Sequence, residues 1–142
     1  MKQRITIENL NELTTEEKEK LRMWWRLRCT PGLFDLYAVK VMHDGIIRYE
    51  GPFVKSGHRD FNEDVHQGEA LPLLSIGQMM ELVQDNLENG FVIEYNQEKT
   101  SYRLHWTIPK ILLPDKLLSD DMQPPDICDA LWLATKTVLA NV

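Results

Sequence analysis

Apolar residues recur at helical spacing in three stretches of the chain. The first predicted helix begins near Thr14 and runs through Lys18–Arg28, and the second follows Ser75. Thr14 and Ser75 each open a capping box, in which a side-chain oxygen accepts from a free backbone amide at the helix start. The third predicted helix covers Ile127 to about Leu139 and is apolar well around its cylinder. We expect such a helix to be covered on more than one side, by the rest of the chain or by a second subunit.

Two hairpins are predicted between these helices. In the first, the strand Leu33–Met42 is followed by the tight-turn signal Asp44-Gly45 and a returning strand, Ile46–Tyr49. The second hairpin is predicted from the alternation of apolar and polar residues in 91–95 and 102–108.

The register of the second hairpin follows from its turn. A turn centred on Gln97–Thr100 sets Tyr95 opposite Tyr102, and it sets Glu94 opposite Arg103 as a favourable cross-strand pair. The elements add up to an α+β fold, in which two hairpins build one antiparallel sheet with about three helices packed on it. We expect residues 1–142 to form a single domain with a long polar connection at about 51–71.

Composition narrows the class of protein. The chain has 142 residues, with 16 lysines and arginines against 22 aspartates and glutamates, giving a net charge of −6. The first 30 residues carry +2 and the remaining 112 carry −8. This balance speaks against binding to duplex nucleic acid, and no apolar run is long enough to cross a membrane. With neither a secretion signal nor paired cysteines in the pattern, we expect a soluble cytoplasmic protein.

A patch at the end of the first predicted helix is the favoured binding site. Adjacent tryptophans on a helix point about 100° apart, so one of the indoles of Trp24 and Trp25 can remain partly exposed beside Arg26 and Arg28. Aromatic and guanidinium groups together suit a base and a phosphate. The alternative is that both rings are core or dimer-interface residues, with the arginines reaching water.

Two further groups of polar residues are candidate sites. Arg103 and His105 share the polar face of the last predicted strand, where they could bind an anion if that face were covered. Histidines and carboxylates also crowd the long connection, where they could ligate a divalent metal. These candidate ligands are His58, Asp60, Asp64 and His66. Their spacing matches no established metal loop, and a solvated loop explains the same crowding.

Three segments of the chain resemble recurring segments of small uncharacterised proteins encoded by phages and prophages of Gram-positive bacteria. The segments are Leu71–Leu82, Asp126–Trp132, and the stretch from Ile5 to Trp25 that contains the first helix. The matching residues are helix caps and apolar faces, so the resemblance implies a genomic context and transfers no active site. Such proteins often block a host component or sequester a signalling molecule in the host cytoplasm.

No catalytic signature is found in the sequence, and no cofactor is expected. The leading hypothesis is therefore a non-enzymatic, phage-encoded counter-defence protein that acts stoichiometrically, by sequestering a nucleotide signal or by blocking a host defence protein. One alternative is a structural or regulatory accessory protein that forms a homo-oligomer through its apolar C-terminal helix. A small metal-dependent enzyme built on the 58–66 loop is the third hypothesis.

Overall fold

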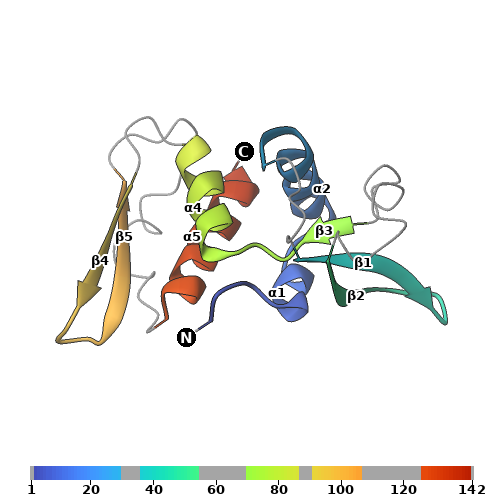
Figure 1. Cartoon of the computed structure of the whole chain (residues 1–142), viewed down its shortest axis with the longest axis horizontal. Coiled ribbons are helices and arrows are strands. Elements are labelled where there is room, and N and C mark those ends of the chain that lie inside the picture. The colour runs from blue at the N-terminus through green and yellow to red at the C-terminus, as the bar shows by residue number, and fades with distance from the viewer. Residues whose placement is uncertain (1, 30–35, 55–69, 87–90, 107–125, 142) are drawn as a thin grey trace. The chain divides into compact units, whose positions relative to one another are not determined.

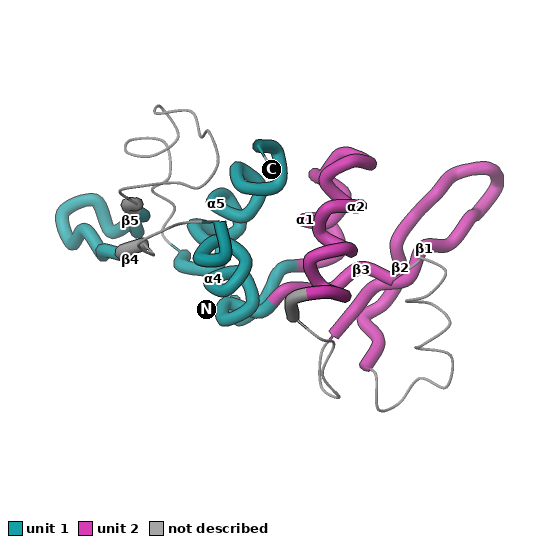
Figure 2. The backbone as a smooth tube through the Cα atoms, turned by 90° about the horizontal axis from the view of Figure 1, so that it is seen from above, with its two compact units in different colours: residues 1–5, 75–142 teal, residues 6–74 magenta. Residues whose placement is uncertain are grey.

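The computed structural model shows an α+β fold, which confirms the predicted class (Figure 1). The described residues are 2–29, 36–54, 70–86, 91–106 and 126–141. The chain divides into two compact units, one of residues 6–74 and one that joins residues 1–5 to residues 75–142 (Figure 2). Organisation as a single domain stays a prediction, and each unit is described by itself.

The unit of residues 6–74 contains three helical segments and a three-stranded sheet in its described part. Its helical segments are α1 (Ile7–Asn11), α2 (Thr15–Trp24) and the π-helix η1 (Trp25–Cys29). Its strands are β1 (Leu36–His43), β2 (Ile46–Val54) and β3 (Ala70–Pro72). The antiparallel order is β2-β1-β3, with α2 packed against β3 and α1 against β2.

The β1–β2 hairpin turns where the sequence predicts. Asp44 and Gly45 have φ values of 50° and 79°, as required by the tight turns whose twist matches that of the strands. The pairing sets Lys40 opposite Tyr49 and Met42 opposite Ile47. Strand β2 continues to Val54, well beyond the predicted end at Tyr49, so the first part of the predicted long connection is strand. Residues 55–69 lie outside the described part of the chain.

An aromatic cluster forms the core of this unit where η1 meets the sheet. Trp25, Tyr37 and Ala70 are buried, and Trp24, Val39 and Phe53 pack against them. The ring centroid of Tyr37 lies 6.3 Å from that of Trp25 and 5.9 Å from that of Phe53. Such tilted pairs add to the stabilisation that burial alone provides.

The second unit contains two helices and a two-stranded sheet in its described part. Its elements are α4 (Ile76–Asp85), β4 (Phe91–Asn96), β5 (Ser101–Trp106) and α5 (Ile127–Asn141). Helix α5 packs against α4 and β5. The β4–β5 register is the predicted one, with Tyr95 opposite Tyr102 and Glu94 opposite Arg103.

The N-terminal residues are fastened to this second unit. Arg4 forms an isolated antiparallel bridge with Ser75, and the backbone N–H of Ile76 donates to the carbonyl of Gln3 at 3.1 Å. The Nζ of Lys2 lies 2.9 Å from a carboxylate oxygen of Asp129 on α5, and this hydrogen bond raises the pKa of Lys2.

One feature of the predicted architecture is corrected by the topology. Both hairpins form, but they belong to two different sheets, β2-β1-β3 and β4-β5, instead of one. Strand β3 pairs with β1 on the edge that β2 does not occupy. The sequence pattern did not reveal β3, because the strand has only three residues. Strand β5 contacts α5, and its Leu104 is fully buried.

Candidate functional site

A groove between α2 and the β1–β2 hairpin is the most chemically distinctive site in the described part of the chain. We call it the α2–hairpin groove; its volume is about 630 Å³. Its lining consists of Thr15, Glu16, Lys18, Glu19, Arg22, Lys40, Ile47 and Tyr49. All eight residues belong to the unit of residues 6–74.

Helix α2 supplies one wall of the groove through its periodicity. Thr15, Lys18, Glu19 and Arg22 stand at offsets of 0, 3, 4 and 7, which places them on one face of the helix. The helix starts at a fixed point, because the Thr14 side chain accepts from the backbone N–H of Glu17 at 3.1 Å. This capping box is the one predicted from the sequence.

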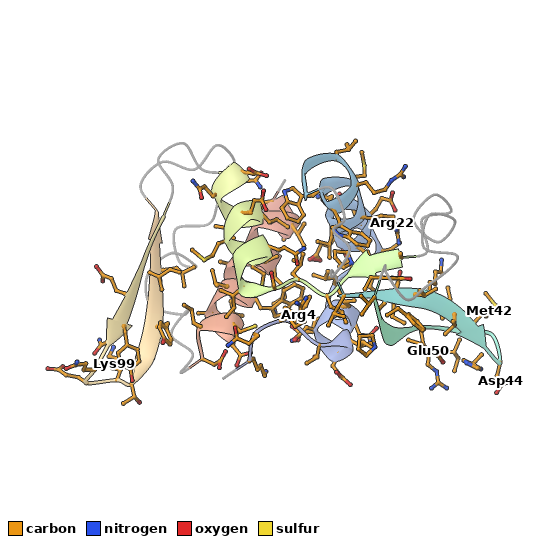
Figure 3. All side chains as sticks on the ribbon, viewed as in Figure 1. Arg4, Arg22, Met42, Asp44, Glu50 and Lys99 are labelled. Carbon is orange, nitrogen blue, oxygen red and sulfur yellow. The ribbon has the colours of Figure 1, made fainter. Side chains whose placement is uncertain are left out.

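The hairpin supplies the other wall through its pleat. Lys40–Tyr49 and Met42–Ile47 are cross-strand pairs two residues apart, so they lie on the same face of the sheet. Arg22 and Met42 lie on the same side of the hairpin ribbon, and Glu50 lies on the other (Figure 3). A carboxylate oxygen of Glu50 lies there at hydrogen-bond distance, 3.0 Å, from Nε2 of His43, so this carboxylate is directed away from the groove.

Two lysines of the groove have no acidic partner in the described part of the chain. Glu16 pairs with Lys20 at 3.1 Å, and Glu19 pairs with Arg22. Among the described residues, neither Lys18 nor Lys40 forms an ion pair. The Nζ of Lys18 lies 5.4 Å from the centroid of the Tyr49 ring, a cation–π geometry that holds the ammonium over the groove wall. The lining therefore carries one more positive than negative charge.

Arg22 is the buried member of the cationic set. Only 9% of this residue is exposed. One guanidinium nitrogen donates to Glu19, and another donates to the Tyr49 hydroxyl at 3.4 Å. The third nitrogen, Nε, is buried and has no hydrogen-bond partner within the described part of the structure. A buried donor without a partner is costly, so this nitrogen weakens the packing of Arg22 unless another group accepts from it.

The charge and shape of the groove are compatible with a small anion. Three cationic groups approach one cavity, and the cavity walls exclude part of the water that would otherwise screen them. Lysine ammonium and arginine guanidinium groups are the usual protein partners of phosphate. The groove lining contains no histidine or cysteine, and the described residues contain no cluster of histidine, cysteine and carboxylate side chains that could hold a metal ion.

The predicted tryptophan patch is only partly compatible with its proposed role. Trp25 is fully buried in the aromatic cluster, so its indole presents no face to a ligand and its assignment as a binding residue is corrected to the core. Trp24 is half-buried against the same cluster, and Arg26 is exposed. The side chain of Arg28 lies outside the described part of the chain. The helix winds into a π-helix at Trp25, which changes the angular spacing used in the prediction.

The remaining predicted site residues are not brought to the groove by the described structure. Arg103 and His105 are in β5, and their side chains are outside the described set. The metal candidates His58, Asp60, Asp64 and His66 fall in 55–69, also outside it.

Sequence reasoning missed the residues that do line the groove. Lys18 and Arg22 read as ordinary members of a solvated helix face, and Lys40 as one polar residue in an apolar strand. A usable signal existed, since Lys18 and Arg22 are spaced by four residues on one helix face. The contribution of Lys40 and Tyr49 depends on a contact between elements that are separate in sequence, which no local pattern contains.

Comparisons with known proteins return no match from family models, curated proteins or solved structures. Within the described residues, no helix combines the length and apolar character needed to span a membrane.

Proposed function

We propose that this chain is a non-catalytic binding protein that holds a small phosphate-bearing ligand in the α2–hairpin groove. The observation that carries the proposal is the pair Lys18 and Lys40, which line the groove without an acidic partner among the described residues. Arg22, one helical turn from Lys18 on α2, adds a buried guanidinium. No catalytic step is proposed, because the lining offers lysine, arginine and tyrosine but no activated nucleophile or acid–base pair.

The biological role proposed for this binding is stoichiometric sequestration. If the chain is a phage counter-defence protein, as its resemblance to small phage-encoded proteins implies, a phosphorylated signal of the host is a fitting ligand. Removing a signal requires affinity and protein abundance, not turnover, and a groove of fixed cations supplies affinity. The bacterial host cytoplasm is the corresponding proposed location.

Titration of the purified chain with inorganic triphosphate tests the site. We expect saturable binding by calorimetry and a rise in melting temperature. The double variant Lys18→Ala/Lys40→Ala is expected to lower the affinity by about 100-fold, at roughly a factor of ten for each charge-assisted contact. Lys99→Ala, on the exposed turn of the β4–β5 hairpin, is the matched control and should bind as the parent does. Absence of binding, or equal affinity of the double variant, would overturn the proposal.

Recovery of the ligand distinguishes sequestration from catalysis. After long incubation with excess protein and release by heat, the triphosphate should be recovered unchanged. Release of orthophosphate in proportion to time and to protein concentration would contradict the non-catalytic role.

Blocking of a host defence protein is the second candidate function. The observation that favours it is the exposed apolar end of the β1–β2 hairpin, formed by Met42, Ile46 and Ile47. Exposed apolar clusters commonly mark interaction surfaces. Stoichiometric co-purification of one host protein, lost on introducing a charge at Ile46, would support this function. Self-assembly through α5 is less favoured, because nine of its residues are already buried.

A further inference from the structure

The apolar end of the hairpin adjoins the cationic groove on one face of the sheet. Met42 is 69% exposed and Ile47 53% exposed, although both are large apolar side chains. They are direct cross-strand partners, so their side chains lie next to each other. Ile47 itself lines the groove. The aliphatic surface is therefore continuous with the cationic site.

The distance between the two surfaces is set by the strand repeat. The Met42–Ile47 pair follows the Lys40–Tyr49 pair by two residues, which corresponds to roughly 7 Å along the strand. The phosphates of a ligand would contact Lys40, Lys18 and Arg22. A second group of the same ligand, about two strand residues from the phosphates, would then contact Met42 and Ile47. In a nucleotide, the ribose separates the phosphates from the base by a comparable span.

We infer that the groove binds a nucleotide, with its phosphates at Lys18, Arg22 and Lys40 and its base against the Met42–Ile47 pair. This inference rests on the proposed function, which assigns the phosphates of the ligand, and adds a site for its base. Two neighbouring side chains standing on a sheet form a broad apolar platform, which suits the flat face of a base. A methionine sulfur also makes favourable contacts with aromatic rings. Inorganic phosphates have no group to place on this platform.

The test compares ligands that share the phosphates and differ in the base. Affinities of ATP, GTP, CTP and UTP are measured by calorimetry beside inorganic triphosphate, at one ionic strength. We expect at least one nucleotide to bind about tenfold or more tightly than triphosphate, from burial of apolar surface on the base. In the variant Met42→Ser/Ile47→Thr, the ratio of nucleotide affinity to triphosphate affinity should fall to about one, because the apolar surface that contacts the base is lost.

Ile46→Ser is the matched control. Ile46 is also large and exposed, but it pairs with His43 on the opposite face of the hairpin. This variant should keep the nucleotide advantage. All three substituted side chains are exposed, so the variants are expected to fold, and circular dichroism verifies it.

The outcomes separate the inference from the proposed function. Binding of triphosphate with no gain for any nucleotide would overturn the inference and leave the phosphate site standing. A nucleotide advantage that survives Met42→Ser/Ile47→Thr would likewise overturn it, since the base would then bind elsewhere. Failure of every phosphate compound to bind would overturn the proposed function itself.

Discussion

The guanidinium of Arg22 donates a hydrogen bond from Nη2 to the hydroxyl oxygen of Tyr49, over 3.4 Å. The two residues lie 27 positions apart, on α2 and β2, and both are buried. This contact joins the helix to the hairpin at the back of the α2–hairpin groove. It also holds the Tyr49 ring beneath the ammonium of Lys18. Tyr49 of β2 therefore contacts two residues of the α2 wall, Arg22 through its hydroxyl and Lys18 through its ring.

Tyr49→Phe removes this hydrogen bond and keeps the ring. We expect a loss of about 1–2 kcal/mol in the free energy of unfolding, because a buried guanidinium donor loses its acceptor. Urea denaturation measures the change. Tyr95→Phe is the control, since Tyr95 is 51% exposed and should change stability by less than about 0.5 kcal/mol. Equal effects of the two substitutions would show that the Arg22–Tyr49 contact does not stabilise the fold.

Trp25→Leu tests the assignment of Trp25 to the core. The substitution leaves a cavity beside Tyr37, and we expect it to lower the free energy of unfolding by about 2–4 kcal/mol. Leu27→Ala, two residues along the π-helix and 72% exposed, should lie within about 0.5 kcal/mol of the parent. A Trp25 variant as stable as the parent would return this residue to the list of surface candidates.

Gly51→Ala and Gly77→Ala form a matched pair of substitutions with opposite expected signs. Gly51 has a φ of 152°, and a Cβ there would lie 2.9 Å from the carbonyl oxygen of Tyr37. We expect a loss of more than about 1 kcal/mol at this position. At Gly77, in the first turn of α4, a Cβ would meet only the Ser75 Oγ at 3.9 Å. The higher helix propensity of alanine should make that variant up to about 1 kcal/mol more stable. Thermal or urea unfolding of the two variants decides the signs, and a stabilising Gly51→Ala would contradict the geometry of β2.

Cys128 is expected to make stability fall at high pH. Burial, with smaller contributions from the carboxylates of Asp126 and Asp129, raises the pKa of this thiol from 9.0 to about 11. Between these two values the unfolded chain loses the proton while the folded chain keeps it, so the thiol's contribution is present below pH 9 and is lost as the pH rises toward 11. In a Cys29→Ser background, the free energy of unfolding should fall more steeply over this range than in Cys29→Ser/Cys128→Ala.

Alkylation provides a second measurement on the same thiol. At pH 8 its thiolate fraction should be about a hundredfold below that of a cysteine with an ordinary pKa, and iodoacetamide should react correspondingly slowly. Reaction as fast as that of free cysteine would contradict the raised pKa. If the free energy of unfolding depended on pH in the same way in Cys29→Ser and in Cys29→Ser/Cys128→Ala, that result would contradict the raised pKa as well.

Elements specified by neighbouring residues were predictable from the sequence. Thr14 and Ser75 mark the starts of α2 and α4 because a cap and its partner lie three residues apart. The register of the β4–β5 hairpin follows from its turn, because each position in an antiparallel pair is then counted outward from the turn.

Elements that have a weak local signal, or that depend on distant partners, were not predictable in the same way. Helix α1 was missed, because its capping box joins Thr6 to Asn9 where a glutamate or glutamine is usual, and its five residues show little periodicity. Strand β3 exists through its pairing with β1, and its three residues carry no alternation to detect. The groove combines residues from α2, β1 and β2, so Lys40 joins Lys18 and Arg22 only when these elements meet.

The bridge between Arg4 and Ser75 makes residues 6–74 topologically an insertion. The chain leaves one compact unit after Ile5 and re-enters it at Ser75, and the two crossing points are held side by side by backbone pairing. Since the flanking backbone is already closed there, replacing the inserted segment requires little loop-closure entropy. The groove-bearing unit is thus inserted at a single place in the chain, where its two ends are already brought together by the pairing of Arg4 with Ser75.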